Sequence, residues 1–127
     1  SIKNILAENL KVNKNNFIFV ALYISFINSL LEEFFFRGFI FLNLKKLIAI
    51  KSAYIISAFA FTVYHIGIMG SWFSPLIFLL AMVGLFAGGI IFNYLNESNS
   101  NIYSSWLVHM MANFAINTVG FIMFDII

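Results

Sequence analysis

The sequence predicts an all-α polytopic membrane protein, built as a bundle of about four transmembrane helices. Of its 127 residues, 62% are hydrophobic, 19% are aromatic and only 9% are charged, and the mean hydropathy is +0.97. A soluble domain of this length has too little interior to bury so much apolar surface. Four apolar stretches, separated by polar segments, are also long enough to cross about 30 Å of hydrocarbon.

The first predicted span covers residues 17–42. It begins after Asn15 and Asn16, which are good helix-capping residues. Its first half is uniformly apolar, whereas its second half carries a cluster of charged side chains. We expect residues 43–46, together with Lys51, to form a short basic connection to the next span.

The second predicted span covers residues 52–69 and ends at Gly70. The third starts at Pro75, because proline is favoured in the first turn of a helix, and it runs to about Asn93. One face of the third span carries a small-xxx-small pattern, which lets another helix approach closely. The residues of this pattern are Ala81, Gly84, Gly88 and Gly89.

A polar loop over residues 96–101 leads to the fourth predicted span, residues 102–124. The polar residues 1–16 show no cleavable signal peptide. Three lysines precede the first span and three follow it, so the positive-inside rule does not decide the orientation. The length allows a single membrane-embedded domain over residues 1–127, either a compact protein or a fragment of a longer one.

Ionisable side chains interrupt three of the four apolar stretches. Glu32, Glu33 and Arg37 lie in the first, His65 closes the second, and His109 lies within the fourth. Three unpaired charges at the centre of a bilayer would cost about 7–10 kcal/mol on insertion scales. Ionisable groups inside a membrane are therefore candidates for a functional site.

The spacing of the charged residues in the first span separates the two carboxylates. Glu33 and Arg37 are four residues apart, so they lie on one helix face and can pair. Glu32 is five residues from Arg37 and is rotated by about 140° from it. Glu32 is therefore free to face a hydrated cavity as a general base. A Glu–Arg pair by itself is equally consistent with a purely structural role.

His109 and Asn113 are also four apart, and they present an imidazole and an amide on one face of the fourth span. Two such donors can converge on one oxygen and stabilise a tetrahedral oxyanion. His65 is placed to join Glu32 in holding a water molecule. Three further amides are interpreted as interhelical hydrogen-bonding residues, namely Asn28, Asn93 and Asn117.

Together these residues form three motifs, each on its own apolar segment. They read Glu32-Glu33-x-x-x-Arg37, Phe61-x-x-x-His65 and His109-x-x-x-Asn113. In content and order they resemble the CPBP family, the CAAX proteases and bacteriocin-processing proteins also called Abi proteins. These are intramembrane relatives of the type II CAAX prenyl endopeptidase. The resemblance spans about residues 17–117, most of the chain.

The resemblance implies an intramembrane endopeptidase in which Glu32, helped by His65, activates the attacking water. His109 and Asn113 would form the oxyanion site, and Glu33 with Arg37 would organise the first motif. Cofactor use stays open, because Glu32, His65 and His109 would also suit a three-ligand zinc site with an open position, as in a metalloprotease. No His-Glu-x-x-His motif is present, so a zincin arrangement is excluded.

The expected substrate is a peptide or protein in or at the lipid bilayer, processed as a CAAX protein or a bacteriocin, or cleaved in self-immunity. The abundance of Ile, Asn, Lys and Phe is typical of a bacterial protein, so we expect a multi-pass protein of the bacterial cell membrane. The net charge of +2 is too small to indicate nucleic-acid binding, and the absence of cysteine excludes thiolate chemistry. The sequence does not determine the oligomeric state.

Two alternatives belong to other functional classes. The first is a non-catalytic membrane immunity or binding protein that keeps the polar cavity for recognition. The second is a small transporter subunit with a buried, proton-carrying glutamate, but this hypothesis does not explain the spacing of His109 and Asn113.

Overall fold

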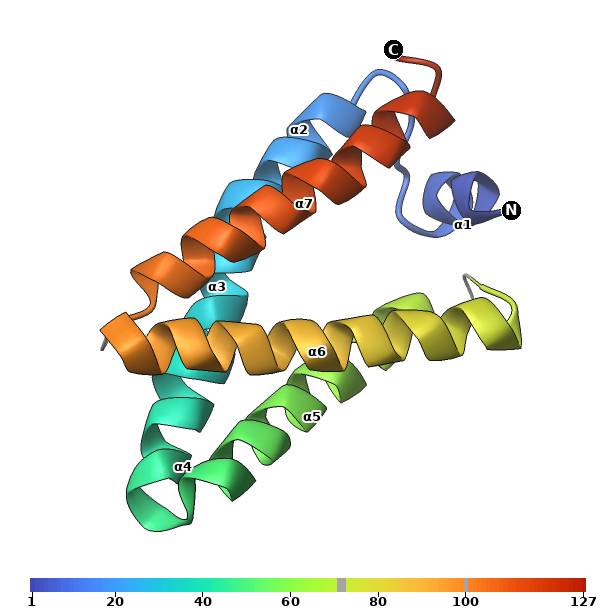
Figure 1. The fold of residues 1–127 in the computed structure, drawn as a ribbon. Coiled ribbons are helices and arrows are strands. Elements are labelled where there is room, and N and C mark those ends of the chain that lie inside the picture. The colour runs from blue at the N-terminus through green and yellow to red at the C-terminus, as the bar shows by residue number, and fades with distance from the viewer. Residues whose placement is uncertain (71–72, 100) are drawn as a thin grey trace.

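The computed structural model describes residues 1–70, 73–99 and 101–127, and all the elements within these ranges are helices (Figure 1). A short helix, α1 (Ile2–Asn9), comes first. One continuous helical span, residues Phe17–Leu47, follows. It is divided into α2 (Phe17–Leu22), η1 (Tyr23–Asn28), α3 (Ser29–Glu33), η2 (Phe34–Phe41) and α4 (Leu42–Leu47). The remaining helices are α5 (Ile50–Met69), α6 (Pro75–Asn99) and α7 (Tyr103–Met123).

Four helices within the described ranges are long and apolar enough to cross a membrane, as the composition predicts. They are the Phe17–Leu47 span, α5, α6 and α7. Large hydrophobic side chains cover their outer surfaces, and Phe19 and Leu76 are each about two-thirds exposed or more, at 70% and 68%. Such a surface is stable only against lipid. The chain is therefore an integral, multi-pass membrane protein, and the all-α fold class is confirmed.

The interior of the bundle contains many polar side chains. The buried polar or charged residues come from all four spans, and they are Ser25, Ser29, Glu32, Glu33, Arg37, Ser57, Thr62, Asn93, Asn96, Ser105, His109 and Asn117. Because lipid cannot satisfy hydrogen bonds, polar side chains in a membrane protein turn toward each other or toward a wet cavity. This inward set locates the site.

The packing brings α7 alongside the first span and lays α6 across the others (Figure 1). Helix α7 packs on α2, η1 and α3, whereas α5 packs on η2 and α6. The first span carries π-helical turns on both sides of α3, in η1 and η2. Turns of this kind occur frequently at functional sites, and here they flank α3, the segment that carries Glu32 and Glu33.

The structure corrects two of the predicted helix ends. Residues 43–46 are not a connection, because the first span stays helical to Leu47 and only Ile48 and Ala49 separate it from α5. Lysines are good helix formers and are favoured near a helix C-terminus, so Lys45 and Lys46 extend the helix.

Helix α6 likewise continues to Asn99, so the predicted loop over residues 96–101 is wrong for residues 96–99, and residue 100 lies outside the described residues. Asn96 is fully buried there, and its Nδ2 donates a hydrogen bond to the Asn101 carbonyl, whereas its Oδ1 has no partner among the described residues.

The beginning of the chain also differs from expectation. The first span does begin at Phe17, but the Asn16 side chain does not cap it. Its Oδ1 instead accepts a hydrogen bond from the Asn13 backbone, which closes the preceding turn. Residues 2–9 form α1, which the polar composition did not reveal. Ser1 caps this helix by accepting a hydrogen bond from the Asn4 backbone N–H.

Only one glycine of the predicted stripe on α6 makes a close helix contact. A Cβ at Gly89 would lie 3.0 Å from the Ala58 Cα and 3.3 Å from the Arg37 Nη2, so α5 and the site both approach its bare backbone. A Cβ at Gly84 or Gly88 would meet nothing within 4 Å. The stripe is therefore a contact surface at Gly89 and an open surface at Gly84 and Gly88.

Gly89→Ala should destabilise the protein by about 1–3 kcal/mol, because the new methyl group overpacks against the α5 backbone. Gly88→Ala is the matched control. It should be neutral or stabilising by up to about 1 kcal/mol, because alanine favours a helix and the site has room. Thermal unfolding in detergent measures both. Equal losses in the two variants would contradict the close approach at Gly89.

Candidate active site

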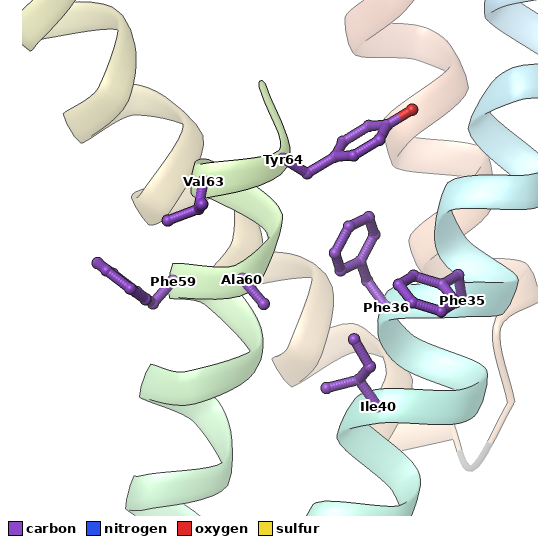
Figure 2. Close-up of a pocket in the computed structure, with 7 residues that line it drawn as sticks. All are labelled: Phe35, Phe36, Ile40, Phe59, Ala60, Val63 and Tyr64. Atoms are coloured by element: carbon purple, nitrogen blue, oxygen red, sulfur yellow. The ribbon is translucent and has the colours of Figure 1, made fainter. Parts of the chain in front are cut away.

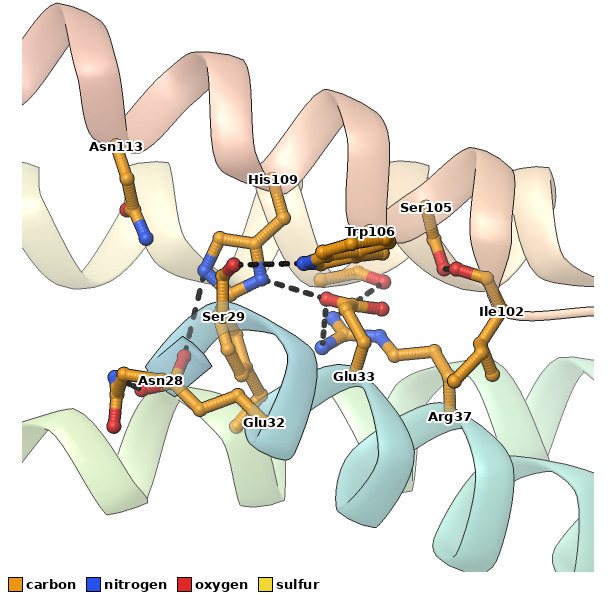
Figure 3. A network of polar contacts seen from close by, with 12 residues as sticks. Asn28, Ser29, Glu32, Glu33, Arg37, Ile102, Ser105, Trp106, His109 and Asn113 are labelled. Atoms are coloured by element: carbon orange, nitrogen blue, oxygen red, sulfur yellow. Dashed lines mark hydrogen bonds and ion pairs between the residues drawn. The ribbon is translucent and has the colours of Figure 1, made fainter. Parts of the chain in front are cut away.

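Three spans bring the predicted site residues to one place in the bundle (Figure 3). Glu32 and Glu33 lie on α3, Arg37 lies on η2, and His65 ends the second motif on α5. His109 and Asn113 lie on α7, which packs directly against α3. Five of the six side chains form one polar network, joined by hydrogen bonds and by the close approach of Glu32 to both histidines, whereas Asn113 stands beside it.

Arg37 is the anchor of this network and has no exposed surface. Its Nη1 donates to Glu33 Oε1 at 3.1 Å, so the expected pair of the first motif forms. Its Nη2 donates to the Gly89 carbonyl and its Nε to Asn93 Oδ1, both at 3.3 Å.

Two aromatic rings complete the surroundings of Arg37. The guanidinium carbon lies 4.4 Å from the Phe61 ring centroid and 4.9 Å from that of Phe92. Both distances suit cation–π attraction, which is stronger away from water. A charge that would be costly in a membrane is thus held by one carboxylate, two neutral acceptors and two ring faces.

Glu33 joins Arg37 to the fourth span. The same Oε1 that accepts from Arg37 lies 2.8 Å from His109 Nδ1, which donates to it. Its other oxygen, Oε2, is buried and has no hydrogen-bond partner among the described residues. The His109 ring also stacks on Phe92, with centroids 4.9 Å apart and planes at 16°. Glu33 and Phe92 therefore fix both the position and the tilt of the imidazole.

Glu32 lies between the two histidines, although only 6% of its surface is exposed. Its Oε2 is 3.4 Å from His109 Nε2 and 3.9 Å from His65 Nε2. His65 Nδ1 lies 2.8 Å from the Phe61 carbonyl, which can only accept, so Nδ1 carries the proton. In the neutral ring, Nε2 is then an acceptor that points toward Glu32.

Asn113 does not meet His109 in a shared hydrogen bond. Its Nδ2 donates to the Ile24 carbonyl in η1 at 3.2 Å. In Figure 3 it stands one turn further along α7, with its amide directed toward the same side as the imidazole. One of its two N–H groups is therefore committed to the backbone, and the amide keeps a second donor.

Several polar contacts were assigned incompletely or missed by the sequence analysis. Asn93 and Asn117 do link helices, through the Tyr54 and Ala21 carbonyls respectively, so the interpretation of these two is confirmed. Asn28 instead donates within its own span, to Glu32 Oε1 at 2.7 Å. Ser57 was missed, and its hydroxyl donates to the Phe36 carbonyl at 3.1 Å. The four-residue spacing of Asn28 and Glu32 in the sequence could have predicted the hydrogen bond between them.

The metal interpretation gains no geometric support. Within the described ranges, no group of three or more His, Cys, Asp or Glu side chains is arranged to hold a metal ion. Glu32, His65 and His109 do approach each other, but the described network is one of hydrogen bonds and ion pairs.

An apolar hollow of about 480 Å³ opens beside this network, between η2 and α5 (Figure 2). Phe36 of its wall packs edge-on against Phe61, which in turn contacts Arg37. Tyr64, also in the wall, directly precedes His65. The lining residues are Phe35, Phe36, Ile40, Phe59, Ala60, Val63 and Tyr64. The hollow is thus an apolar surface within reach of the polar cluster.

Comparison with known protein families identifies a match. The model of a family described as "Type II CAAX prenyl endopeptidase Rce1-like" matches residues 14–115, a range that includes all six predicted site residues. No curated protein and no solved structure matches the chain.

The pairing of Glu33 and Arg37 is tested by a double-mutant cycle with Glu33→Gln and Arg37→Gln. Each single variant leaves one buried charge without its partner and should lose about 3–5 kcal/mol of stability. The double variant removes both charges and should be more stable than either single variant. Thermal unfolding in detergent measures all three. Additive losses would show that the two residues do not act as a pair.

Proposed function

The chain belongs to the Rce1-like family of type II CAAX prenyl endopeptidases, and on this premise we propose that Glu32 activates the water that attacks the peptide bond. Family membership makes the protein an intramembrane protease, and the contacts around Glu32 support its role. The observation that carries the proposal is the position of Glu32 Oε2, which faces an imidazole nitrogen from α5 and another from α7. No other carboxylate in the described network has two histidines at one oxygen.

Water activation follows from the gap between Glu32 and His65. Their facing atoms are 3.9 Å apart, too far for a direct hydrogen bond but suited to a bridging water. Glu32 Oε2 takes a proton from that water while the water oxygen bonds to the scissile carbonyl carbon. The electron pair of the C=O double bond moves to the carbonyl oxygen. When the C–N bond breaks, Glu32 returns the proton to the leaving amine. His65 orients the water through its Nε2 acceptor.

His109 and Asn113 are proposed to stabilise the oxyanion. Both ring nitrogens of His109 face carboxylate oxygens, which only accept hydrogen bonds. A ring that donates from both nitrogens is an imidazolium. Its charge, with that of Arg37, would balance the charges of Glu32 and Glu33, and Nε2–H would be available to an oxyanion. Asn113 would supply its second N–H, the one not used by Ile24.

The substrate is proposed to be a peptide that reaches the site from the bilayer. The apolar hollow between η2 and α5 suits a lipid-modified segment such as a prenylated CAAX end (Figure 2). Bacteriocin processing or self-immunity in a bacterial cell membrane would use the same chemistry on other membrane-bound peptides. Residues 1–127 would act as a single membrane-embedded protease core.

Glu32→Gln should remove nearly all cleavage of a farnesylated CAAX peptide in detergent, because an amide cannot accept the proton of the water. The fold should persist, since Gln keeps the shape of Glu. Glu97→Gln, at the end of α6 and hydrogen-bonded to Tyr54, is the matched control and should cleave normally. Near wild-type cleavage by Glu32→Gln would disprove the assignment. An inactive wild type would favour the non-catalytic immunity or binding protein.

Asn113→Ala should lower kcat about 100–1,000-fold with little change in KM, because an oxyanion donor acts only as negative charge develops. The effect corresponds to roughly 2.7–4 kcal/mol of transition-state stabilisation. A raised KM with intact kcat would instead identify a peptide-binding face.

Metal content should be measured on the same preparations, together with His109→Ala. If His109 is a zinc ligand, this variant should lose bound metal and chelators should stop wild-type cleavage, while Asn113→Ala keeps its metal. If His109 is an oxyanion donor, both variants should lose kcat and chelators should have no effect.

A further inference from the structure

We propose that Asn28 is a positioning residue that selects which oxygen of Glu32 acts as the base. This inference rests on the proposed function of Glu32. Asn28 is the last residue of η1 and lies outside the three motifs that point to the protease site. Its Nδ2 donates to Glu32 Oε1 at 2.7 Å, the shortest hydrogen bond to either central carboxylate.

The two oxygens of Glu32 have different surroundings. Oε1 is held by the Asn28 amide, whereas Oε2 faces His65 and His109 across 3.9 and 3.4 Å. In Figure 3, Asn28 lies at the end of the network, on the other side of Glu32 from His109. A hydrogen bond at Oε1 therefore keeps Oε2 directed at the imidazoles, where the water is proposed to sit. Without that bond the carboxylate can rotate about its last torsion, which has a broad energy profile.

The choice of an amide as donor also matters. Glu33, the neighbouring carboxylate, is held by the guanidinium of Arg37, so its charge is balanced by a full positive charge. Asn28 orients Glu32 with a charge-assisted hydrogen bond but brings no charge of its own. Two adjacent glutamates on one helix thus differ in their partners. Arg37 balances the charge of Glu33, whereas Glu32 is aimed by a neutral amide at one oxygen and faces His109 only with the oxygen that acts as the base.

Asn28→Leu should lower kcat about 10–100-fold and leave KM little changed, because it removes an orienting bond rather than a substrate contact. Asn28→Gln keeps the amide donor and should recover part of the lost kcat. Asn117→Leu is the matched control. It removes hydrogen bonds to the Ala21 carbonyl and Ser25 Oγ, neither of which is a contact of Glu32, so it should lower the melting temperature while folded protein keeps its kcat. The assay uses the full chain in detergent with a farnesylated CAAX peptide.

Equal loss of kcat in Asn28→Leu and Asn117→Leu, or no recovery in Asn28→Gln, would overturn the positioning role. A second readout does not depend on activity. The infrared carboxylate band that disappears in Glu32→Gln should shift in Asn28→Leu and stay in place in Asn117→Leu. An unmoved band in Asn28→Leu would refute the inference. A shifted band in a protein that cleaves nothing would refute the proposed function and leave the contact established.

Discussion

The arrangement of the site depends on the buried guanidinium of Arg37. Arg37 has no exposed surface in a helix that crosses the membrane, so each of its contacts must come from the protein. Glu33 supplies the opposite charge, Gly89 and Asn93 supply neutral acceptors from α6, and two aromatic rings cover the guanidinium. Because lipid offers no hydrogen-bond acceptors, the two hydrogen bonds from Arg37 to α6 lock that helix to the first span. The fourth span joins them through the His109–Glu33 hydrogen bond.

The contacts of Arg37 with α6 explain where that helix requires a glycine and where it does not. Gly89 lies where Arg37 and α5 both press on α6, whereas Gly88 lies in open space one residue earlier. The small-xxx-small pattern indicated helix contact for the whole stripe, but sequence alone does not say which neighbours face inward. The register of α6 against α5 decides that, and the hydrogen bond from Asn93 on α6 to the Tyr54 carbonyl on α5 holds the two helices in this register.

The sequence predicted what depends on spacing within one helix and that Asn93 and Asn117 would link helices, but it did not predict which atoms they or His109 would meet on the neighbouring helices. The four spans and the Glu33–Arg37 pair follow from hydropathy and from a four-residue interval. The extension of α6 to Asn99 was not predicted, because the polar residues 96–99 are typical of a loop. Asn96 is in fact buried in the fold, which the sequence does not show. The contact of His109 with both carboxylates needs the packing angle of α7 on α3, which no periodicity contains.

The two central glutamates show how one dipeptide can hold two chemically different carboxylates. Both are almost fully buried, so exposure does not distinguish them. Their partners do. Glu33 shares one oxygen between a guanidinium and an imidazole, which makes it part of the scaffold, whereas Glu32 has an amide on one oxygen and two imidazoles facing the other. A buried carboxylate is tolerated only when its charge is paired or hydrogen-bonded. Glu32 meets this condition through Asn28 at one oxygen and His109 at the other, and the 3.9 Å between that second oxygen and His65 Nε2 leaves room for a bridging water, which favours a reactive role for this residue.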